Sequence, residues 1–284
     1  MNKITISGAS GFVGQNIGKF LAENGFEVIA LARGRKKVGF GKTVVSKDLT
    51  ERNLVNHAKG SAALLHLIGI GRQSPDSDFE AINVGLTKNA ISLCKRAGIK
   101  KLVYLSGLGA STKSTSAYFI SKFKAEQEII QSGLDYTIFR PSYIVGGGDQ
   151  LSGTISRQVA RGSVVIIGSG RYRLQPISVL DVSRVVLKSI SDKRFSRKII
   201  DLVGPRAVTY EHFVRDLVGP GAKIRHVDFE SAYHDAMRSA ASEFGVDDLG
   251  ILVGDYVGDH KRLAKISKMK FTGYDETLEA CRLS

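Results

Sequence analysis

A glycine-rich turn near the start of the chain constrains the fold more than any other feature of the sequence. The turn, GASGFVG at 8–14, follows an apolar run at 3–7 and precedes a run with helical apolar spacing. Glycines let the backbone turn tightly and approach a pyrophosphate closely, and the unpaired N–H groups at a helix start favour an anion. The order strand, turn, helix therefore predicts a nucleotide site, against the alternative of a merely structural turn.

The residue after the second expected strand, 27–32, indicates which nucleotide the turn would hold. An NAD site usually places a carboxylate there to accept from the ribose 2'-hydroxyl, whereas the 2'-phosphate of NADP needs a cation. This chain has Arg33, followed by a glycine and three basic residues at 34–37, with no carboxylate between Glu27 and Asp48. A planar guanidinium suits a phosphate. The sequence favours NADP(H), with NAD(H) as the alternative cofactor and a solvated basic loop as the alternative role.

A tyrosine and a lysine lie four residues apart in a segment, 116–132, with helical apolar spacing. Tyr118 and Lys122 would therefore share one face of a helix. A lysine ammonium near a phenol, together with the positive nicotinamide, stabilises the phenolate and makes tyrosine an acid–base group near neutral pH. This spacing is common on helix surfaces, but downstream of a glycine turn it indicates a catalytic pair.

Strands and helices alternate along most of the chain. The expected strands lie near 3–7, 27–32, 43–46, 62–68, 100–106 and 135–140, and the expected helices near 11–24, 51–59, 77–97 and 116–132. Such alternation predicts an α/β fold with a doubly wound parallel Rossmann sheet. We expect the NAD(P)-binding domain to comprise 1–145 and 176–204. A smaller C-terminal α/β substrate lobe would then comprise 146–175 and 205–284.

With these motifs in place, the chain resembles the short-chain dehydrogenase/reductase superfamily, in its extended and atypical branches. The resemblance spans most of the chain and also rests on 48–49, Asn83, 102–106, 140–142 and 175–182. The segments 67–69, 106–110 and 175–182 are most similar to the group that contains the NADPH-binding accessory subunit of respiratory complex I. That group also includes reductase-like and quinone-biosynthesis relatives.

The resemblance implies roles for matching residues. It places Gly8, Ser10, Gly11, Phe12 and Val13 at the pyrophosphate, Arg33 at the 2'-phosphate, Asp48 and Leu49 at the adenine edge, Leu67, Ile68 and Gly69 at the nicotinamide ribose, and Pro141 and Ser142 beside the nicotinamide. Lys122 would bridge the ribose hydroxyls and lower the pKa of Tyr118, which would donate or accept the proton.

Ser106 would polarise the substrate carbonyl. The gap from Ser106 to Tyr118 is shorter than extended members usually show, so other hydroxyls remain alternatives, or the role is vacant. These alternatives are Ser111, Thr112, Ser114, Thr115 and Ser116.

The resemblance implies an NADP-dependent oxidoreductase that transfers hydride to or from a small carbonyl, enone or quinone-linked substrate. Two alternatives stay open. A non-catalytic accessory subunit of a membrane-associated respiratory or quinone-biosynthesis complex would bind NADPH without turning it over. A nucleotide-sugar epimerase or dehydratase would use the same fold and the same Tyr118 and Lys122 but return the hydride to its substrate.

The charge of the chain bears on its partners. A net charge of +14 creates a field that attracts anions, nucleic acid or an acidic membrane surface. The basic residues are scattered and no nucleic-acid motif appears, so we expect no nucleic-acid partner. A small-molecule substrate is expected, and a peripheral membrane or acidic protein partner is compatible with the charge.

Cysteine and histidine usage indicates a reducing compartment and no metal. Cys94 and Cys281 make neither a disulfide framework nor a zinc site, and His66 lies in a buried-strand pattern typical of a core residue. A first strand starting at Lys3 and a longest apolar stretch of 62–70 lead us to expect neither a signal peptide nor a membrane span. The expected location is cytoplasmic, with the membrane periphery as the variant that the charge allows.

Overall fold

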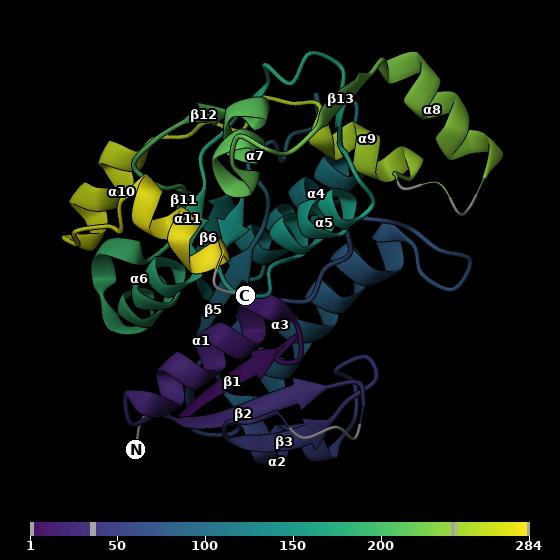
Figure 1. Cartoon of the computed structure of the whole chain (residues 1–284). Helices are drawn as coiled ribbons and strands as arrows, with labels where there is room; N and C mark the ends of the chain where they lie inside the picture. The colour runs from purple at the N-terminus through teal and green to yellow at the C-terminus, as the bar shows by residue number, and fades with distance from the viewer. Residues whose placement is uncertain (1–2, 35–37, 240–241, 243, 283–284) are drawn as a thin grey trace.

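The computed structural model describes residues 3–34, 38–239, 242 and 244–282. Within these ranges, seven parallel strands form the central sheet in the order β11-β6-β5-β4-β1-β2-β3. The order reverses between β1 and β4, because β2 and β3 extend the sheet on one side of β1 and β4, β5 and β6 on the other (Figure 1). The predicted doubly wound sheet is confirmed.

The strands of this sheet lie within two residues of their expected bounds, except β11, which forms in the segment 176–204 that was expected in this domain without strand bounds. They are β1 (Lys3–Ser7), β2 (Glu27–Ala32), β3 (Lys42–Val45), β4 (Ser61–His66), β5 (Lys101–Leu105), β6 (Asp135–Pro141) and β11 (Lys198–Leu202). The strand expected at 62–68 ends earlier, at His66, and the next residues leave the sheet beside the glycine turn.

Helices cover both faces of the sheet. On one face lie α1 (Phe12–Glu23) and α6 (Val179–Ser191), whose apolar side chains join the first core with Ile4, Ile6 and Phe139. On the other lie α2 (Asn53–Ala58), α3 (Leu86–Ala97) and α4 (Ala117–Gln131), which form the second core with Leu64, Leu102 and Ile138. Apolar residues at helical spacing thus bury one stripe of each helix against the strands.

The helix expected at 77–97 is interrupted. A π-helix, η1 (Glu80–Gly85), precedes α3. The Asn83 side chain bonds to both the N–H and the carbonyl of Ile70 and to the Ser121 hydroxyl, and the Asn83 carbonyl accepts from Thr87 Oγ1. Polar groups inserted in this way widen a helical turn, and such π-turns often accompany functional sites. The wide turn ties the segment after β4 to α4.

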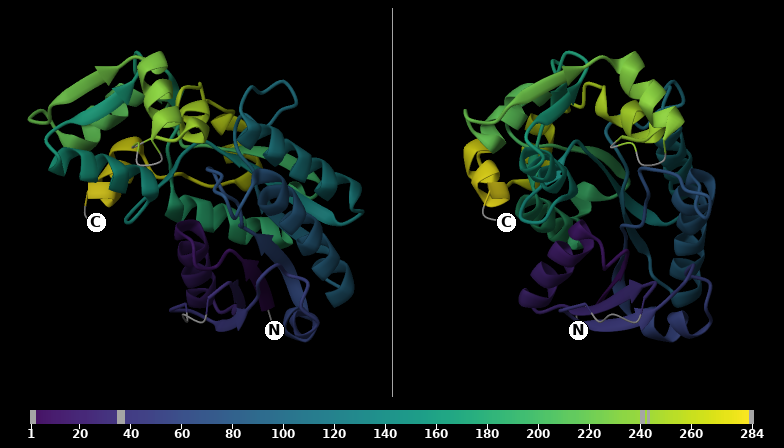
Figure 2. Two further views of the ribbon diagram at one scale, coloured as in Figure 1. Left: turned by 90° about the vertical axis from the view of Figure 1, so that its right-hand side faces the viewer. Right: turned by 45° about the vertical axis from the view of Figure 1, so that its right-hand side comes forward.

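The remaining elements follow β6 in the chain, and most of them lie above the carboxyl ends of the strands in the view of Figure 1. They are β7 (Ile144–Val145), α5 (Gln150–Ala160), β8 (Val164–Ile167), β9 (Arg173–Leu174), β10 (Ile177–Ser178), η2 (Lys193–Phe195), β12 (Val208–Thr209), α7 (Tyr210–Val218), β13 (Ile224–Val227), α8 (Phe229–Arg238), α9 (Val246–Leu252), α10 (His260–Ser267) and α11 (Tyr274–Arg282). Of these, η2 and α10 instead pack beside the sheet, where Leu263 of α10 joins the first core. Figure 2 shows α8 at the margin of the upper part of the molecule.

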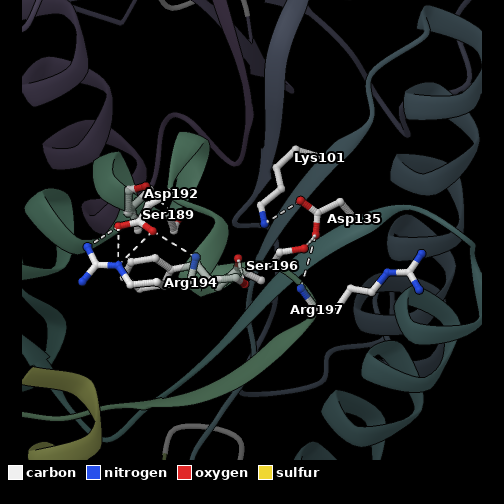
Figure 3. A network of polar contacts seen from close by, with 10 residues as sticks. Lys101, Asp135, Ser189, Asp192, Arg194, Ser196 and Arg197 are labelled. Atoms are coloured by element: carbon white, nitrogen blue, oxygen red, sulfur yellow. Dashed lines mark hydrogen bonds and ion pairs between the residues drawn. The ribbon is translucent and has the colours of Figure 1, made fainter. Parts of the chain in front are cut away.

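The amino ends of β5 and β6 carry a polar network (Figure 3). The Asp135 carboxylate accepts from Lys101 Nζ at 3.1 Å, from Ser196 Oγ at 2.7 Å and from the Arg197 backbone N–H at 3.2 Å. These bonds and the Lys101 charge hold the pKa of Asp135 below its ordinary value, although burial opposes them. The network joins the start of β11 to the centre of the sheet.

Candidate active site

The glycine turn joins β1 to α1 in a backbone shape that suits an anion. Gly8 has φ +81°, and a β-carbon there would lie 2.8 Å from the Leu67 carbonyl carbon, while one at Gly14 would lie 2.2 Å from the Gly8 oxygen. Side chains are therefore excluded at both positions. No side chain caps the start of α1, no acidic residue occupies its first turn, and Ser10 and Gly11 are exposed. Its first N–H groups can meet a pyrophosphate.

The residues expected at the adenosine end follow two neighbouring strands. Arg33 comes directly after β2 and is exposed; residues 35–37 of the basic run lie outside the described residues. Asp48 follows β3, and its bonds to the Thr50 hydroxyl and N–H lower its pKa. Leu49 has φ +69° and packs its side chain into the second core, while its N–H donates to Ser46 Oγ and its carbonyl accepts from Arg96.

Tyr118 lies in the first turn of α4 with its ring against the carboxyl end of β5. A β-carbon at Gly107 would be 3.5 Å from Tyr118 Cε1. The ring is half-buried between Phe79, at 6.0 Å, and Phe119, at 4.9 Å between centroids. Burial raises the pKa of Tyr118 to about 12, the direction opposite to the one that the tyrosine–lysine spacing predicts.

Lys122 is buried one turn along the same helix, with 3% of its surface exposed. Its Nζ donates to the Leu105 carbonyl at 2.7 Å and lies 4.4 Å from the centre of the Tyr104 ring. A β-carbon at Gly69 would be 3.3 Å from this Nζ, so Lys122 reaches the segment expected to line the nicotinamide ribose. Burial lowers the pKa of Lys122 to about 7.

Ser106 follows β5 and has a buried hydroxyl without a hydrogen-bond partner in the structure. Among the alternatives, the Ser111 and Ser114 hydroxyls already accept from the N–H groups of Lys113 and Ser116 in local turns. A buried hydroxyl without a partner is costly unless a ligand uses it. Ser106 is therefore the better-placed hydroxyl for a substrate carbonyl.

Pro141 and Ser142 lie at the end of β6, beside this serine. The Pro141 carbonyl accepts from Leu108 N, while the Ser142 hydroxyl donates to the Tyr256 carbonyl and accepts from Gln175 N. The Ser142 side chain thus fastens the C-terminal part of the chain to the sheet. A nicotinamide at this position would therefore contact the Pro141 ring and the backbone of the two residues rather than the Ser142 hydroxyl.

Two neighbours of the site were not predicted from the sequence. Glu126, fully buried on α4, binds Arg140 of β6 through two hydrogen bonds of 2.9 and 2.6 Å. Its place one turn after Lys122 was the signal available for it. Tyr256 packs its ring 5.3 Å from that of Phe119, and no local pattern marks it.

The expectation that His66 is a core residue is confirmed. Its side chain is fully buried, and Nδ1 lies 2.8 Å from the Ser7 hydroxyl. Burial and the nearby Lys122 charge lower the pKa of His66 to about 3, so the ring is neutral at pH 7. Across the described residues, no three His, Cys, Asp or Glu side chains gather into a group that could hold a metal ion.

A doubly wound sheet with a glycine turn at its switch point defines a dinucleotide-binding Rossmann fold. The chain belongs to the NAD(P)H-binding family, whose model matches residues 8–193. Part of the chain is 28% identical to the mitochondrial NADH dehydrogenase (ubiquinone) 1 alpha subcomplex subunit 9 of Arabidopsis thaliana, over 72% of this chain and 54% of the relative. The ceramide reductase of Caulobacter vibrioides is 29% identical over 63% of this chain and 58% of the relative.

A solved structure supports the same fold. MoeE5 in complex with UDP-glucose and NAD superposes with a TM-score of 0.75 at 20% identity, covering 99% of this chain and 98% of that one. The predicted likeness to extended short-chain dehydrogenase/reductases is confirmed at the level of fold and NAD(P) binding. The chain spans little more than half the length of the curated relatives named above. No helix within the described residues combines the length and apolar character needed to cross a membrane.

Proposed function

We propose that this protein is an NADP-dependent oxidoreductase that transfers hydride to or from a small, uncharged carbonyl or enone, including quinone-linked compounds. The observation that carries the proposal is the unpartnered Ser106 hydroxyl at the carboxyl end of β5, at the strand edge that also holds the glycine turn. The Tyr118 ring approaches the next residue, Gly107. A hydroxyl donor, a phenol and a buried ammonium at one sheet edge are the groups that carbonyl reduction needs.

The cofactor would lie across the carboxyl edge of the sheet. The fit rests on the uncapped start of α1, on the glycines that admit close backbone approach, and on exposed Arg33 for a 2'-phosphate. When bound, the nicotinamide supplies or accepts the hydride. Ser106 donates to the carbonyl oxygen, Tyr118 exchanges its hydroxyl proton with that oxygen, and Lys122 binds ribose hydroxyls.

The wall around Tyr118 favours a flat, apolar substrate. The rings of Phe79 and Phe119 contact that of Tyr118, with centroids 6.0 and 4.9 Å away. Tyr256 packs against Phe119, and Tyr143 packs against Tyr256. Two nearby arginines, Arg72 and Arg173, are bound by Asp248 and Asp255. Rings pack on apolar and conjugated surfaces, whereas a diphosphate requires cations that are not already paired.

A non-catalytic accessory subunit is the second candidate, because the mitochondrial relatives are named as subunits of an NADH dehydrogenase. The raised pKa of Tyr118 also favours it, since a phenol with a pKa of about 12 is almost wholly protonated at pH 7 and is a weak proton donor. In either role, the division into 1–145 plus 176–204 and 146–175 plus 205–284 stays a prediction. A peripheral membrane or acidic protein partner would suit the net charge of +14.

Transfer of deuteride separates these functions. The purified protein is given NADPH deuterated at the reactive carbon with a panel of ketones, enones and quinones. In a second arm it is given NAD+ or NADP+ with UDP-sugars, because an epimerase must first oxidise its sugar. Deuterium in a reduced carbonyl product supports the proposal. Isomerised sugar with no net cofactor reduction would indicate an epimerase, and tight NADPH binding without any transfer would indicate the accessory role.

A further inference from the structure

Few charged groups face the buried Lys122 ammonium. His66 from β4 and Tyr104 from β5 flank it and are neutral at pH 7, because burial lowers the pKa of His66 and raises that of Tyr104. Asn83 adds an uncharged amide beside Gly69, and Tyr118 lies one turn earlier on α4. Among the described residues, Glu126 is the carboxylate whose charge acts on Lys122 and raises its pKa.

Glu126 is held in place by its neighbours. It has no exposed surface, it lies one helical turn after Lys122, and both of its oxygens accept from Arg140. A bidentate guanidinium satisfies a buried carboxylate and fixes its orientation. The bond also gives Arg140 a raised pKa, so the guanidinium is charged throughout the working pH range.

The charges continue beyond this pair. Arg140 is the register partner of Asp201 on β11, and the Asp201 charge acts on it. Asp201 in turn accepts from the Asp259 N–H at 3.1 Å. Charges of alternating sign therefore run from Glu126 on α4 through Arg140 on β6 to Asp201 on β11. The Asp259 N–H fixes the far end of this row.

We infer that Glu126 is a positioning residue that keeps Lys122 charged, and that Arg140 tempers this effect by binding the same carboxylate. The charge on Lys122 is a property of the chain alone. Its consequence for NADPH affinity rests on the proposed function, in which a protonated Lys122 donates to the ribose.

The inference requires that substitutions of Glu126 and of Arg140 shift the pKa of Lys122 in opposite directions. Glu126→Gln removes the opposite charge next to Lys122, so the lysine should lose its proton at lower pH. Arg140→Gln removes a like charge and frees the carboxylate, so the lysine should keep its proton to higher pH. A purely structural ion pair predicts loss of stability in both variants and no opposed titration. An opposite charge close to an ionisable group typically shifts its pKa by about one unit or more.

The test is a lysine titration in the full chain followed by NMR on side-chain labels, with the Lys122 signal assigned by its absence in Lys122→Arg. We expect the midpoint to fall by about one unit in Glu126→Gln and to rise in Arg140→Gln. Glu126→Asp, which keeps the charge, should restore most of the shift. Asp135→Asn at the amino edge is the matched control and should leave the Lys122 midpoint in place.

If a single variant does not fold, the double variant Glu126→Gln with Arg140→Gln decides, because it removes the pair without leaving one charge buried. A lower Lys122 midpoint in the double variant supports the inference, since Glu126 is the nearer charge along α4. Shifts of the same sign in both single variants, or no shift in folded protein, would overturn it. Midpoints that move as expected while the pH dependence of NADPH affinity does not would instead reject the proposed role of Lys122.

Discussion

The carboxyl and amino ends of the central strands, here called the carboxyl edge and the amino edge, differ in how their buried polar groups are hydrogen-bonded. At the carboxyl edge, Ser106 Oγ and His66 Nε2 are buried without a hydrogen-bond partner in the structure. At the amino edge, Asp135 binds Lys101, Ser196 and the Arg197 N–H (Figure 3). An unmet buried polar group lowers the free energy of unfolding, whereas a satisfied one stabilises the fold. We assign the missing partner of Ser106 to the substrate, while His66 stays a core residue. The contrast separates residues that we assign to chemistry from residues that stabilise the sheet.

The largest expected effect concerns Tyr118. Tyr118→Phe removes the hydroxyl proton and should lower hydride transfer by about 10² to 10³, because general acid–base groups contribute on this order. NADPH affinity, measured by titration calorimetry, should stay within about twofold of the original, since the ring and its packing remain. Tyr136→Phe, on β6 near the amino edge, is the matched control and should retain full turnover. Undiminished transfer in Tyr118→Phe would remove the phenol from the mechanism.

The next effect concerns the adenosine end of the same edge. With Arg33 available for a 2'-phosphate, NADPH should bind at least about tenfold more tightly than NADH, a difference of about 1.4 kcal/mol. Arg33→Asp should weaken NADPH selectively, because a carboxylate repels the phosphate but can accept from a ribose hydroxyl. Arg197→Asp, an exposed change at the amino edge, should leave the ratio unaltered. Equal affinities for the two cofactors in the original protein would contradict the role of Arg33.

Replacing a serine by alanine at each edge compares a hydroxyl that has a hydrogen-bond partner with one that has none. Ser196→Ala removes a hydrogen bond to the Asp135 carboxylate and should cost about 1 kcal/mol of unfolding free energy. Ser106→Ala removes a hydroxyl that has no partner and should change stability by less than about 0.5 kcal/mol while reducing turnover. Urea denaturation and the deuteride assay measure the two quantities. Similar stability losses in the two variants would remove the distinction between the edges.

The pH dependence of the Ser196 effect has a definite sign. Because the folded pKa of Asp135 is lowered, the stabilisation by its partners is present above the unfolded value of about 3.9 and is lost as pH falls through the folded pKa. The stability gap between the original protein and Ser196→Ala should therefore be constant near neutral pH and shrink in acid. A gap that grew on acidification would reject a charged acceptor.

The smallest expected effect concerns the charge of the whole chain. If the net charge of +14 serves docking, the protein should float with anionic vesicles at low salt and detach toward physiological salt, as screening shortens the interaction. Vesicles of neutral lipid provide the control. Equal and negligible flotation with both would leave the charge as a feature of composition.

Local patterns in the sequence determined the secondary structure of this protein and the place of its glycine-rich turn. The glycine-rich turn at 8–14 indicates a strand that passes directly into a helix, and alternating apolar periods place strands and helices within a few residues. The shared helical face of Tyr118 and Lys122 follows from their spacing alone. These features depend on residues close together in the chain, and for this reason they can be predicted from the sequence.

Tertiary structure alone decided which polar groups are paired. The Glu126–Arg140 bond, the packing of Tyr256 against Phe119 and the π-turn around Asn83 all join segments distant in the chain. Tertiary structure also distinguishes two serines: Ser196 donates a hydrogen bond to Asp135, whereas the Ser106 hydroxyl has no partner. A side chain's partners are set by which elements pack beside it, and burial then determines what an unmet hydrogen bond or charge costs.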